Sequence, residues 1–415
     1  MSANNRDSKR HVIYKKVSRD KSIAAYLSRK DFVDHGTHID PVDGVLVVDT
    51  GYIKDLKVYC RLSCIFRYGP EDIGVIGQAF KRDLYVSTIQ MYPPMDENPK
   101  PLTKLQERVM KKVGNKSLPF CFEFPNHLPC SVCLQPGTKD PDKLCSVDFE
   151  VHVFCVSSLE DRIRKRSSVR LAIRKIQYAP DRAGPHPAAE ISKHFLMSDH
   201  PLHLMASLNK EVHYHGEPIN VNVEVNNKSN KQVKSIRISV EQKTTVVLYS
   251  NDNYIEEVAV VEADDQIATG STLSKTYTIL PSVANNRDKG GIALDGKSKH
   301  EVSNLASSTI LNEGADREVQ GMLVSYAIKV SLLIPSMMGD LTASDATLEI
   351  PFLLMHPRPE IRKKMTSLLR MLQNFLQRQR KWKMMNDSCH TLASHVESTC
   401  LFVAQLNMAK NCLTA

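Results

Sequence analysis

The sequence lacks any run of about 18 apolar residues, the length that a helix needs to cross a lipid bilayer. Its first residues, MSANNRDSKRH, are polar and basic, so we expect no secretory leader. The ten cysteines are therefore expected to be thiols in a reducing compartment. These absences predict a cytoplasmic protein and exclude a disulfide-stabilised secreted domain.

The sequence also lacks the patterns that usually mark an active site. Neither HExxH nor GxSxG occurs, and the 15 histidines are scattered. Cys130 and Cys133 have the spacing of half a zinc site, but no second pair follows at a useful distance, which favours buried thiols on strands. We therefore predict that the protein is not an enzyme and uses no metal or cofactor.

One nucleotide-binding pattern does occur, GIALDGKS at residues 291–298. A phosphate-binding loop of this kind works only between a buried strand and a helix. Residues 283–290 are a polar stretch, and residues 299–304 carry no helical apolar stripe. The pattern favours an ordinary glycine-rich loop. The alternative is a nucleotide hydrolase that uses Lys297 and Ser298.

The positive charge is concentrated at the end of the chain. Residues 357–415 hold ten Lys or Arg and three acids, a net charge of +7 out of +9 for the whole protein. The rest is nearly neutral, which argues against a nucleic-acid-binding body. We predict a divergent, basic and poorly ordered tail at 357–415. Alternatively, its apolar stripe lies on an anionic membrane, and the stripe comprises Leu368, Leu369, Leu372, Phe375 and Leu376.

Short segments of alternating apolar and polar residues dominate the rest of the chain and predict β-strands. Clear examples are 45–49, 57–66, 84–89, 219–225, 236–240 and 324–332. Residues 179–188 contain three prolines and a glycine, which is typical of a hinge. We therefore predict an all-β protein with two tandem β-sandwich domains, at 1–178 and 189–356, on either side of a hinge at 179–188.

One stretch in the first domain differs from its surroundings. Leu102, Leu105, Val109 and Val113 recur at helical spacing, and the opposite face is rich in Lys and Arg. A proline at the start and a glycine just after the end are good boundary signals. The pattern predicts a single short amphipathic helix over 101–113.

The strand SVRLAI at 168–173 carries a charge that needs an explanation. Val169, Leu171 and Ile173 alternate onto one face, so Arg170 points to the other, beside the small Ala172. An arginine that cannot reach water must be paired, or it costs several kcal/mol. We expect a carboxylate partner from elsewhere in the chain.

Several clusters of cations would form a site for phosphate groups if the fold brings them together. Each cluster taken alone is typical of a solvated face. The candidate phosphate-binding residues are Lys15, Lys16, Arg19, Lys30, Lys165, Arg166, Lys297 and Lys299.

Long contiguous segments of the sequence resemble the arrestin family, and within it the visual rod type, over residues 10–357. The segments are HVIYKKVSRDKS at 11–22, RKDFVDH at 29–35, FRYGPEDIGVIG at 66–77, SSVRL at 167–171, GIALDGK at 291–297 and NLASSTI at 304–310. The resemblance implies two curved β-sandwiches and no catalysis. It also implies binding to an activated, phosphorylated seven-helix receptor, for the visual type light-activated rhodopsin. That binding blocks G-protein coupling and ends signalling.

The resemblance implies a buried polar core that senses phosphate. We expect Arg170 to be the sensor and Asp31 and Asp295 its partners. Where the family has a third acid, this chain has Val302, and the family's acidic tail with a second arginine is replaced by a basic one. The core is then either smaller but still balanced, or weakened, in which case receptor binding depends less on phosphorylation.

The resemblance also implies contact surfaces. Lys15 and Lys16 match the first phosphate contacts. The residues matching the receptor finger loop are Tyr68, Gly69, Glu71, Asp72, Ile73, Val75, Ile76 and Gly77. Those matching a three-element clasp are Val12, Ile13, Tyr14, Leu105, Val109 and Val113. Those matching membrane-edge loops, for which ordinary loop packing is the alternative, are Phe195, Met197, Met337 and Met338.

The expected partners are therefore a phosphorylated receptor and, peripherally, the membrane of a photoreceptor cell, in its inner and outer segments. Self-association is a further expectation, and nucleic acid is not expected. An arrestin-fold trafficking adaptor without receptor specificity is the remaining alternative. The long match to the receptor-facing loop argues against it.

Overall fold

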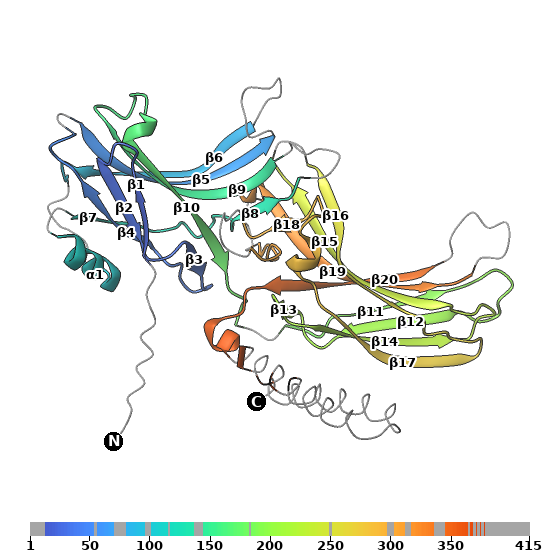
Figure 1. Ribbon diagram of the computed structural model, residues 1–415. Coiled ribbons are helices and arrows are strands. Elements are labelled where there is room, and N and C mark those ends of the chain that lie inside the picture. The colour runs from blue at the N-terminus through green and yellow to red at the C-terminus, as the bar shows by residue number, and fades with distance from the viewer. Residues whose placement is uncertain are drawn as a thin grey trace, which may run out of the picture. The chain divides into compact units, whose positions relative to one another are not determined.

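The computed structural model describes residues 13–377 with several gaps, and the structural statements below concern the described residues. The gaps are 54–55, 70–79, 96–100, 115–116, 137–143, 182–183, 249–250, 297–302, 312–316, 336–344, 364–365, 368–370, 372–373 and 375–376. The chain divides into two compact units, residues 1–356 and 357–415. Figure 1 shows that strands dominate the first unit.

The first half of the chain forms two facing sheets. One has the order β1-β2-β4-β7, made of β1 (Tyr14–Val17), β2 (Ile23–Leu27), β4 (Val42–Val48) and β7 (Ser117–Phe122). The other has the order β18-β8-β9-β10-β3, with β5 on β9 and β6 on β5. Its strands are β18 (Ala293–Leu294), β8 (Val132–Leu134), β9 (Leu144–Val156), β10 (Ser168–Gln177), β3 (Asp31–Asp34), β5 (Lys57–Gly69) and β6 (Phe80–Tyr92).

The core between these sheets follows from period-two alternation. Along β10, Val169, Leu171 and Ile173 are buried, whereas the residues between them are on the other face. Leu62 on β5 and Val151 on β9 are fully buried in the same core. Burial of such side chains is the main favourable term that holds the two sheets together.

The predicted helix is present, but it begins later than expected. Helix α1 spans Lys104–Val113, and Thr103 and Gln106 form a reciprocal capping box at its start. Gly114 ends it with a φ of 92°, a conformation that favours glycine. Val109 is buried against β4 and β7, whereas Leu102 precedes the helix and is exposed.

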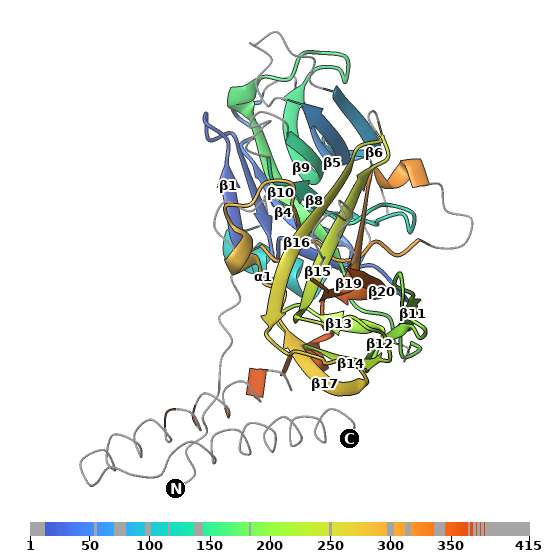
Figure 2. The same cartoon turned by 90° about the vertical axis from the view of Figure 1, so that its right-hand side faces the viewer.

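The second half of the chain forms another pair of sheets. The first has the order β11-β12-β14-β17, made of β11 (Ala188–Lys193), β12 (Leu202–Leu208), β14 (Ile219–Asn227) and β17 (Ser271–Ile279). The second has the order β13-β20-β19-β15-β16, made of β13 (Val212–Tyr214), β20 (Ala346–Met355), β19 (Met322–Leu333), β15 (Ser235–Val246) and β16 (Asn253–Ala263). In Figure 2, β12, β14 and β17 lie below β13 and β20 as a second layer.

The two sandwiches are joined by more than the connecting segment. Strand β18, which follows β17 in sequence, pairs with β8 of the first sandwich. Tyr178 forms a parallel bridge with His356, and the Ala179 N–H donates to the His356 carbonyl. These contacts place the end of β10, the segment after β18 and the end of β20 together. The predicted architecture of two tandem β-sandwiches is confirmed.

The second unit begins with a helical segment at 359–363, in which the Arg362 N–H donates to the Arg358 carbonyl. The leucines and phenylalanine of the predicted apolar stripe lie outside the described residues. Within the described part of the chain, no helix is long and apolar enough to cross a membrane.

Candidate functional site

The arginine that pairs in the buried core is Arg174, and the prediction of Arg170 is wrong. Arg170 has 61% of its side chain exposed and lies 3.6 Å from Glu150. Arg174 has only 13% exposed. Both are on the outward-facing side of β10, because they are four residues apart on a strand. What differs is the neighbouring strand.

Strand register explains this difference. Arg170 lies opposite His152 on β9, whereas β10 leaves β9 after Ile173 and pairs in parallel with β3. In that pairing Arg174 is directly opposite Asp31. The segment after β18 covers the same place, since a side chain on Gly296 would touch the Arg174 stem.

The Arg174–Asp31 pair has the geometry of a strong ion pair. Arg174 Nε donates to Asp31 Oδ1 at 2.7 Å, and Nη2 donates to Oδ2 at 2.7 Å. Such a bidentate contact fixes the orientation of the guanidinium and is stronger than a single neutral hydrogen bond. Arg174 Nη1 also donates to the backbone carbonyl of Asp295 at 3.4 Å. The arginine therefore connects β10 with both β3 and the segment after β18.

Asp295 is buried beside this pair in its own set of hydrogen bonds. Its Oδ1 accepts from the Ser307 N–H at 3.1 Å, and its Oδ2 lies 2.5 Å from His356 Nε2. Burial acts to raise the pKa of Asp295, but His356, His215 and the Ser307 bond hold it below its ordinary value. Asp31 and Asp295 were expected to be carboxylate partners of Arg170, but they lie beside Arg174, which Asp31 meets through its carboxylate and Asp295 through its backbone carbonyl. His356 and His215 were not predicted, because nothing in the sequence marks them.

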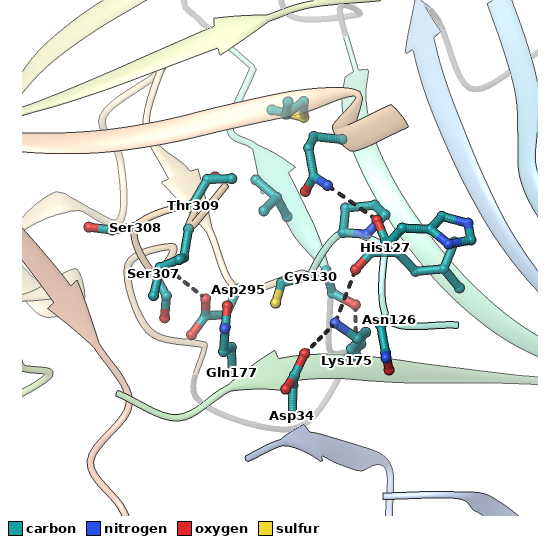
Figure 3. Close-up of a pocket in the computed structure, with 17 residues that line it drawn as sticks. Asp34, Asn126, His127, Cys130, Lys175, Gln177, Asp295, Ser307, Ser308 and Thr309 are labelled. Atoms are coloured by element: carbon teal, nitrogen blue, oxygen red, sulfur yellow. Dashed lines mark hydrogen bonds and ion pairs between the residues drawn. The ribbon is translucent and has the colours of Figure 1, made fainter. Parts of the chain in front are cut away.

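A second buried ion pair lies next to this core. Figure 3 shows Lys175, Asp34 and Asp295 around a small cavity of about 70 Å³. Lys175 Nζ lies 3.1 Å from Asp34 Oδ2 and 3.0 Å from the Leu128 carbonyl, and its side chain is 2% exposed. The cavity is far smaller than the roughly 300 Å³ or more of a typical small-molecule site.

Exposed cations lie beside the outward-facing side of β10. The ammonium group of Lys16 on β1 donates to the Arg170 carbonyl at 2.5 Å. The ammonium group of Lys15 lies over the Tyr26 ring at 5.5 Å, and that of Lys30 over the Tyr14 ring at 4.5 Å. Arg170 thus belongs to this exposed basic surface and lies four residues from the buried Arg174.

Hydrogen bonds to Asp20 hold together two basic segments, the turn after β1 and the segment before β10. The Asp20 carboxylate accepts hydrogen bonds from Ser18 and Ser22 in the turn after β1 and from Ser167 before β10. Although burial acts to raise it, these bonds lower the pKa of Asp20 to about 2. The Asp20 N–H also donates to the Arg166 carbonyl. The carboxylate therefore holds the Arg19 turn against the segment of Lys165 and Arg166.

Of the four predicted membrane-edge residues, the structure describes Phe195 and Met197, and only Met197 is exposed. Phe195 is 9% exposed and belongs to the hydrophobic core, so its placement at an exposed edge is wrong. Its two neighbours, Leu196 and Met197, are 86% and 91% exposed. The sequence FLM does not show which apolar residue points inward.

Several predicted site residues lie outside the described part of the chain. They are Glu71, Asp72, Ile73, Val75, Ile76, Gly77, Val12, Lys297, Lys299, Val302, Met337 and Met338. Of the finger loop, Tyr68 is described, and its hydroxyl donates to Asp252 at 2.8 Å. Gly69 ends β5. Of the clasp, Ile13, Tyr14, Leu105 and Val113 are half-buried, and Val109 is buried.

The nucleotide-loop alternative finds no support in the described part of the pattern. Ala293 and Leu294, between its two glycines, form strand β18 on β8, and the Asp295 carboxylate is occupied by His356 and Ser307. Cys133 is a buried thiol on β8, and neither it nor Cys130 forms a disulfide. Burial raises the pKa of Cys130, as expected for a structural thiol.

The fold has two tandem β-sandwiches and a basic surface, and Arg174, which is paired with Asp31 in the first sandwich, also contacts the Asp295 carbonyl in the segment after β18. These features define a class of binding protein. The family model for the arrestin (or S-antigen) N-terminal domain matches residues 23–179, and that for the C-terminal domain matches residues 198–359. The chain belongs to the arrestin family.

Individual arrestins resemble the chain over most of its length. S-arrestin of Xenopus laevis is 57% identical over 351 residues, which cover 85% of this chain and 88% of that protein. S-arrestin of Homo sapiens is 55% identical over 353 residues, 84% of this chain and 87% of that protein. Beta-arrestin-2 of Bos taurus is 52% identical over 347 residues, which cover 84% of this chain and 81% of that protein. The protein is thus a non-enzymatic regulator that binds phosphorylated receptors and terminates signalling.

Proposed function

We propose that this protein binds a light-activated, phosphorylated receptor of the rhodopsin type in the cytoplasm of photoreceptor cells, and that Arg174 senses the receptor phosphate. The receptor class is supported by the likeness to S-arrestins of several species. The sensing mechanism is supported by one observation above all, the bidentate pair between Arg174 and Asp31.

The pair is suited to sensing because its two members belong to separate strands. Asp31 is on β3 and Arg174 is on β10. The Arg174 guanidinium also contacts the backbone carbonyl of Asp295 in the segment after β18. Removing one partner of a buried pair leaves the other charge uncompensated, at a cost of about 3–5 kcal/mol where both groups are fully buried. Asp31 is 37% exposed, so the cost here is smaller, and a competing anion can approach from its side.

A receptor phosphate carries about −1.5 to −2 charges and three acceptor oxygens. It competes with the single negative charge of Asp31 for the guanidinium. When Arg174 turns to the phosphate, its bonds to Asp31 and Asp295 are lost, and the two sandwiches are no longer connected through this side chain. Phosphate binding then shifts an equilibrium between a state in which Arg174 keeps its bonds to Asp31 and Asp295 and a state in which these bonds are broken.

The exposed cations provide a path to this pair. Lys16 contacts the backbone of Arg170, and Arg170 and Arg174 are on the same side of β10. Phosphates that first meet Lys15 and Lys16 are therefore close to the strand that carries the sensor. Guidance by surface charges is expected to weaken as salt is added.

Peripheral contact with the membrane is part of the proposal. Leu196 and Met197 are the exposed apolar residues at the tip of the loop after β11. Met197 has a φ of 61°, so the backbone turns sharply there. Their insertion at the lipid surface would add affinity without altering the phosphate sensor.

The test is co-sedimentation with rod disc membranes that are dark or illuminated, and phosphorylated or not. We expect the wild-type protein to sediment only with illuminated, phosphorylated membranes. Arg174→Glu should also bind illuminated membranes that lack phosphate. The matched control is Arg170→Glu, the same charge reversal four residues earlier, which should weaken binding but keep the phosphate requirement.

Binding in none of the four states contradicts the receptor assignment. If Arg170→Glu rather than Arg174→Glu removes the phosphate requirement, the sensor assignment is wrong.

A further inference from the structure

Three side chains with metal-binding atoms meet next to the Arg174–Asp31 pair. They are His215, from the turn after β13, Asp295, from the segment after β18, and His356, at the end of β20. One ligand atom from each lies within 4.8 Å of the other two. The imidazole centroids of the two histidines are 4.7 Å apart, and their planes are inclined at 60°.

The cluster is fixed by a second layer of contacts. The Ser307 N–H donates to Asp295 Oδ1, and the Ser307 hydroxyl lies 3.0 Å from His215 Nε2. One residue therefore orients two of the three side chains, and Figure 3 shows it facing Asp295. Hydrogen bonds of this kind hold the ligands of metal centres in position. Asp295 is buried at 6% exposure, and His356 is 15% exposed, which leaves a route from solvent.

We propose that His215, Asp295 and His356 form a binding site for a divalent transition-metal ion, with Zn²⁺ as the best match. Two imidazoles and one carboxylate are ligands that zinc accepts, and a water molecule or the Ser307 hydroxyl can take the fourth position. Zinc bonds of about 2.0–2.2 Å place neighbouring ligand atoms roughly 3.3 Å apart in a tetrahedron. The ligand atoms here are already within 4.8 Å, so side-chain rotations suffice to reach that spacing. The ion would replace the His356–Asp295 hydrogen bond.

The positive charge of Arg174 does not oppose this site strongly. Its guanidinium is paired with the Asp31 carboxylate and meets Asp295 through the backbone carbonyl. A metal ion here would join the turn after β13, the segment after β18 and the end of β20. The inference does not depend on the proposed receptor or on phosphate sensing.

A second cluster of the same composition provides the control. His35, His38 and Asp40 also bring their ligand atoms within 4.8 Å of one another. Asp40 Oδ2 is occupied by Arg29 at 2.6 Å and by the Val33 N–H at 3.2 Å, and His38 is exposed. A cluster whose carboxylate already neutralises an arginine is the poorer site.

The test is titration of the metal-free full chain with Co²⁺, which reports four-coordinate binding by strong visible absorption, followed by displacement with Zn²⁺. We expect one ion per chain. His356→Gln should abolish the absorption, Ser307→Ala should weaken binding at least tenfold, and His38→Gln should leave both unchanged. Melting curves show whether each variant folds. If His356→Gln does not fold, Ser307→Ala, which retains all three ligands, provides the test. Absence of the absorption in the wild type would overturn the proposal, as would its loss in His38→Gln alone.

Discussion

Arg174 Nε and Nη2 each lie 2.7 Å from an oxygen of Asp31, and the two residues are directly opposite each other in the parallel pairing of β10 with β3. The same strand carries Arg170 in the same orientation, yet Arg170 has 61% of its side chain in solvent. Two arginines of one strand therefore have different roles, one in the connection between sandwiches and one on the surface.

This difference predicts different effects on stability. Asp31→Ala should lower the free energy of unfolding by about 1–3 kcal/mol, because it leaves the guanidinium of Arg174 without its main partner. Glu150→Ala removes the partner of the exposed Arg170 and should change stability by less than about 0.5 kcal/mol. Urea unfolding of both variants measures the two values. Equal effects would contradict the burial difference between the two arginines.

His152 makes stability depend on pH. It lies between Arg170 and Arg61 in the cross-strand row of β10, β9 and β5, and burial together with these two cations lowers its pKa to about 4. The unfolded chain, with an ordinary histidine pKa of 6.5, therefore binds a proton that the folded chain does not. The stability that this group contributes is fully present above pH 6.5 and is lost as the pH falls towards 4. We expect a loss of about 1 kcal/mol between pH 7 and 5.

The measurement is denaturant unfolding at pH 7 and pH 5 for the wild type and His152→Gln. The variant cannot be protonated, so the difference between the two pH values should shrink by about the same 1 kcal/mol. Arg170→Gln should reduce it partly, because one of the two repelling cations is gone. An unchanged difference in His152→Gln would assign the pH dependence to other groups.

Asp20 should affect both stability and phosphate binding. Asp20→Ala removes the acceptor of three serine hydroxyls, so we expect a loss of about 1–3 kcal/mol in unfolding free energy. The segments of Arg19 and Arg166 then separate, and the affinity for a multiply phosphorylated peptide should fall. Asp161→Ala, a change in another surface loop, is the control. Calorimetric titration with the peptide would contradict the account if affinity in Asp20→Ala matched that of the control.

In the loop after β11, the first of three consecutive apolar residues is packed in the core and the next two are exposed. Phe195→Ala should cost about 3 kcal/mol of stability, because Phe195 is part of the core. Leu196→Ser with Met197→Ser should leave the unfolding free energy unchanged and lower binding to lipid vesicles. Thermal melting and vesicle flotation measure the two properties. Destabilisation by the serine variant would mean that these side chains are packed.

Much of the fold follows from the sequence, because the period-two pattern of apolar residues is strong. The strands around 219–225 and 324–332 appear as β14 and β19, and the glycine-bounded helix appears as α1. Helix α1 begins at Lys104 rather than at residue 101, because the capping residue is Thr103, whose hydroxyl accepts from the Gln106 N–H. The pattern of apolar residues alone does not show which polar residue caps a helix.

The site is less predictable, because burial of an outward-facing residue depends on which strand is its neighbour. Alternation puts Arg170 and Arg174 on the same side of β10, and only the change of partner from β9 to β3 after Ile173 distinguishes them. That change is a matter of topology, which local spacing does not encode. The contacts of Asp295 with His356 and Ser307 are likewise long-range, so no local sequence signal predicts them.

If phosphate acts by breaking the Arg174–Asp31 pair, exchanging the charges of these two residues should restore the dependence on phosphate. Binding to illuminated, unphosphorylated disc membranes is measured for Arg174→Glu, Asp31→Arg and the double variant that carries both changes. Each single variant should bind without phosphate, because the pair is broken. The double variant restores an ion pair of reversed polarity, so it should again fail to bind unphosphorylated membranes. Equal binding by the double variant and the single variants would show that phosphate does not act by breaking this pair.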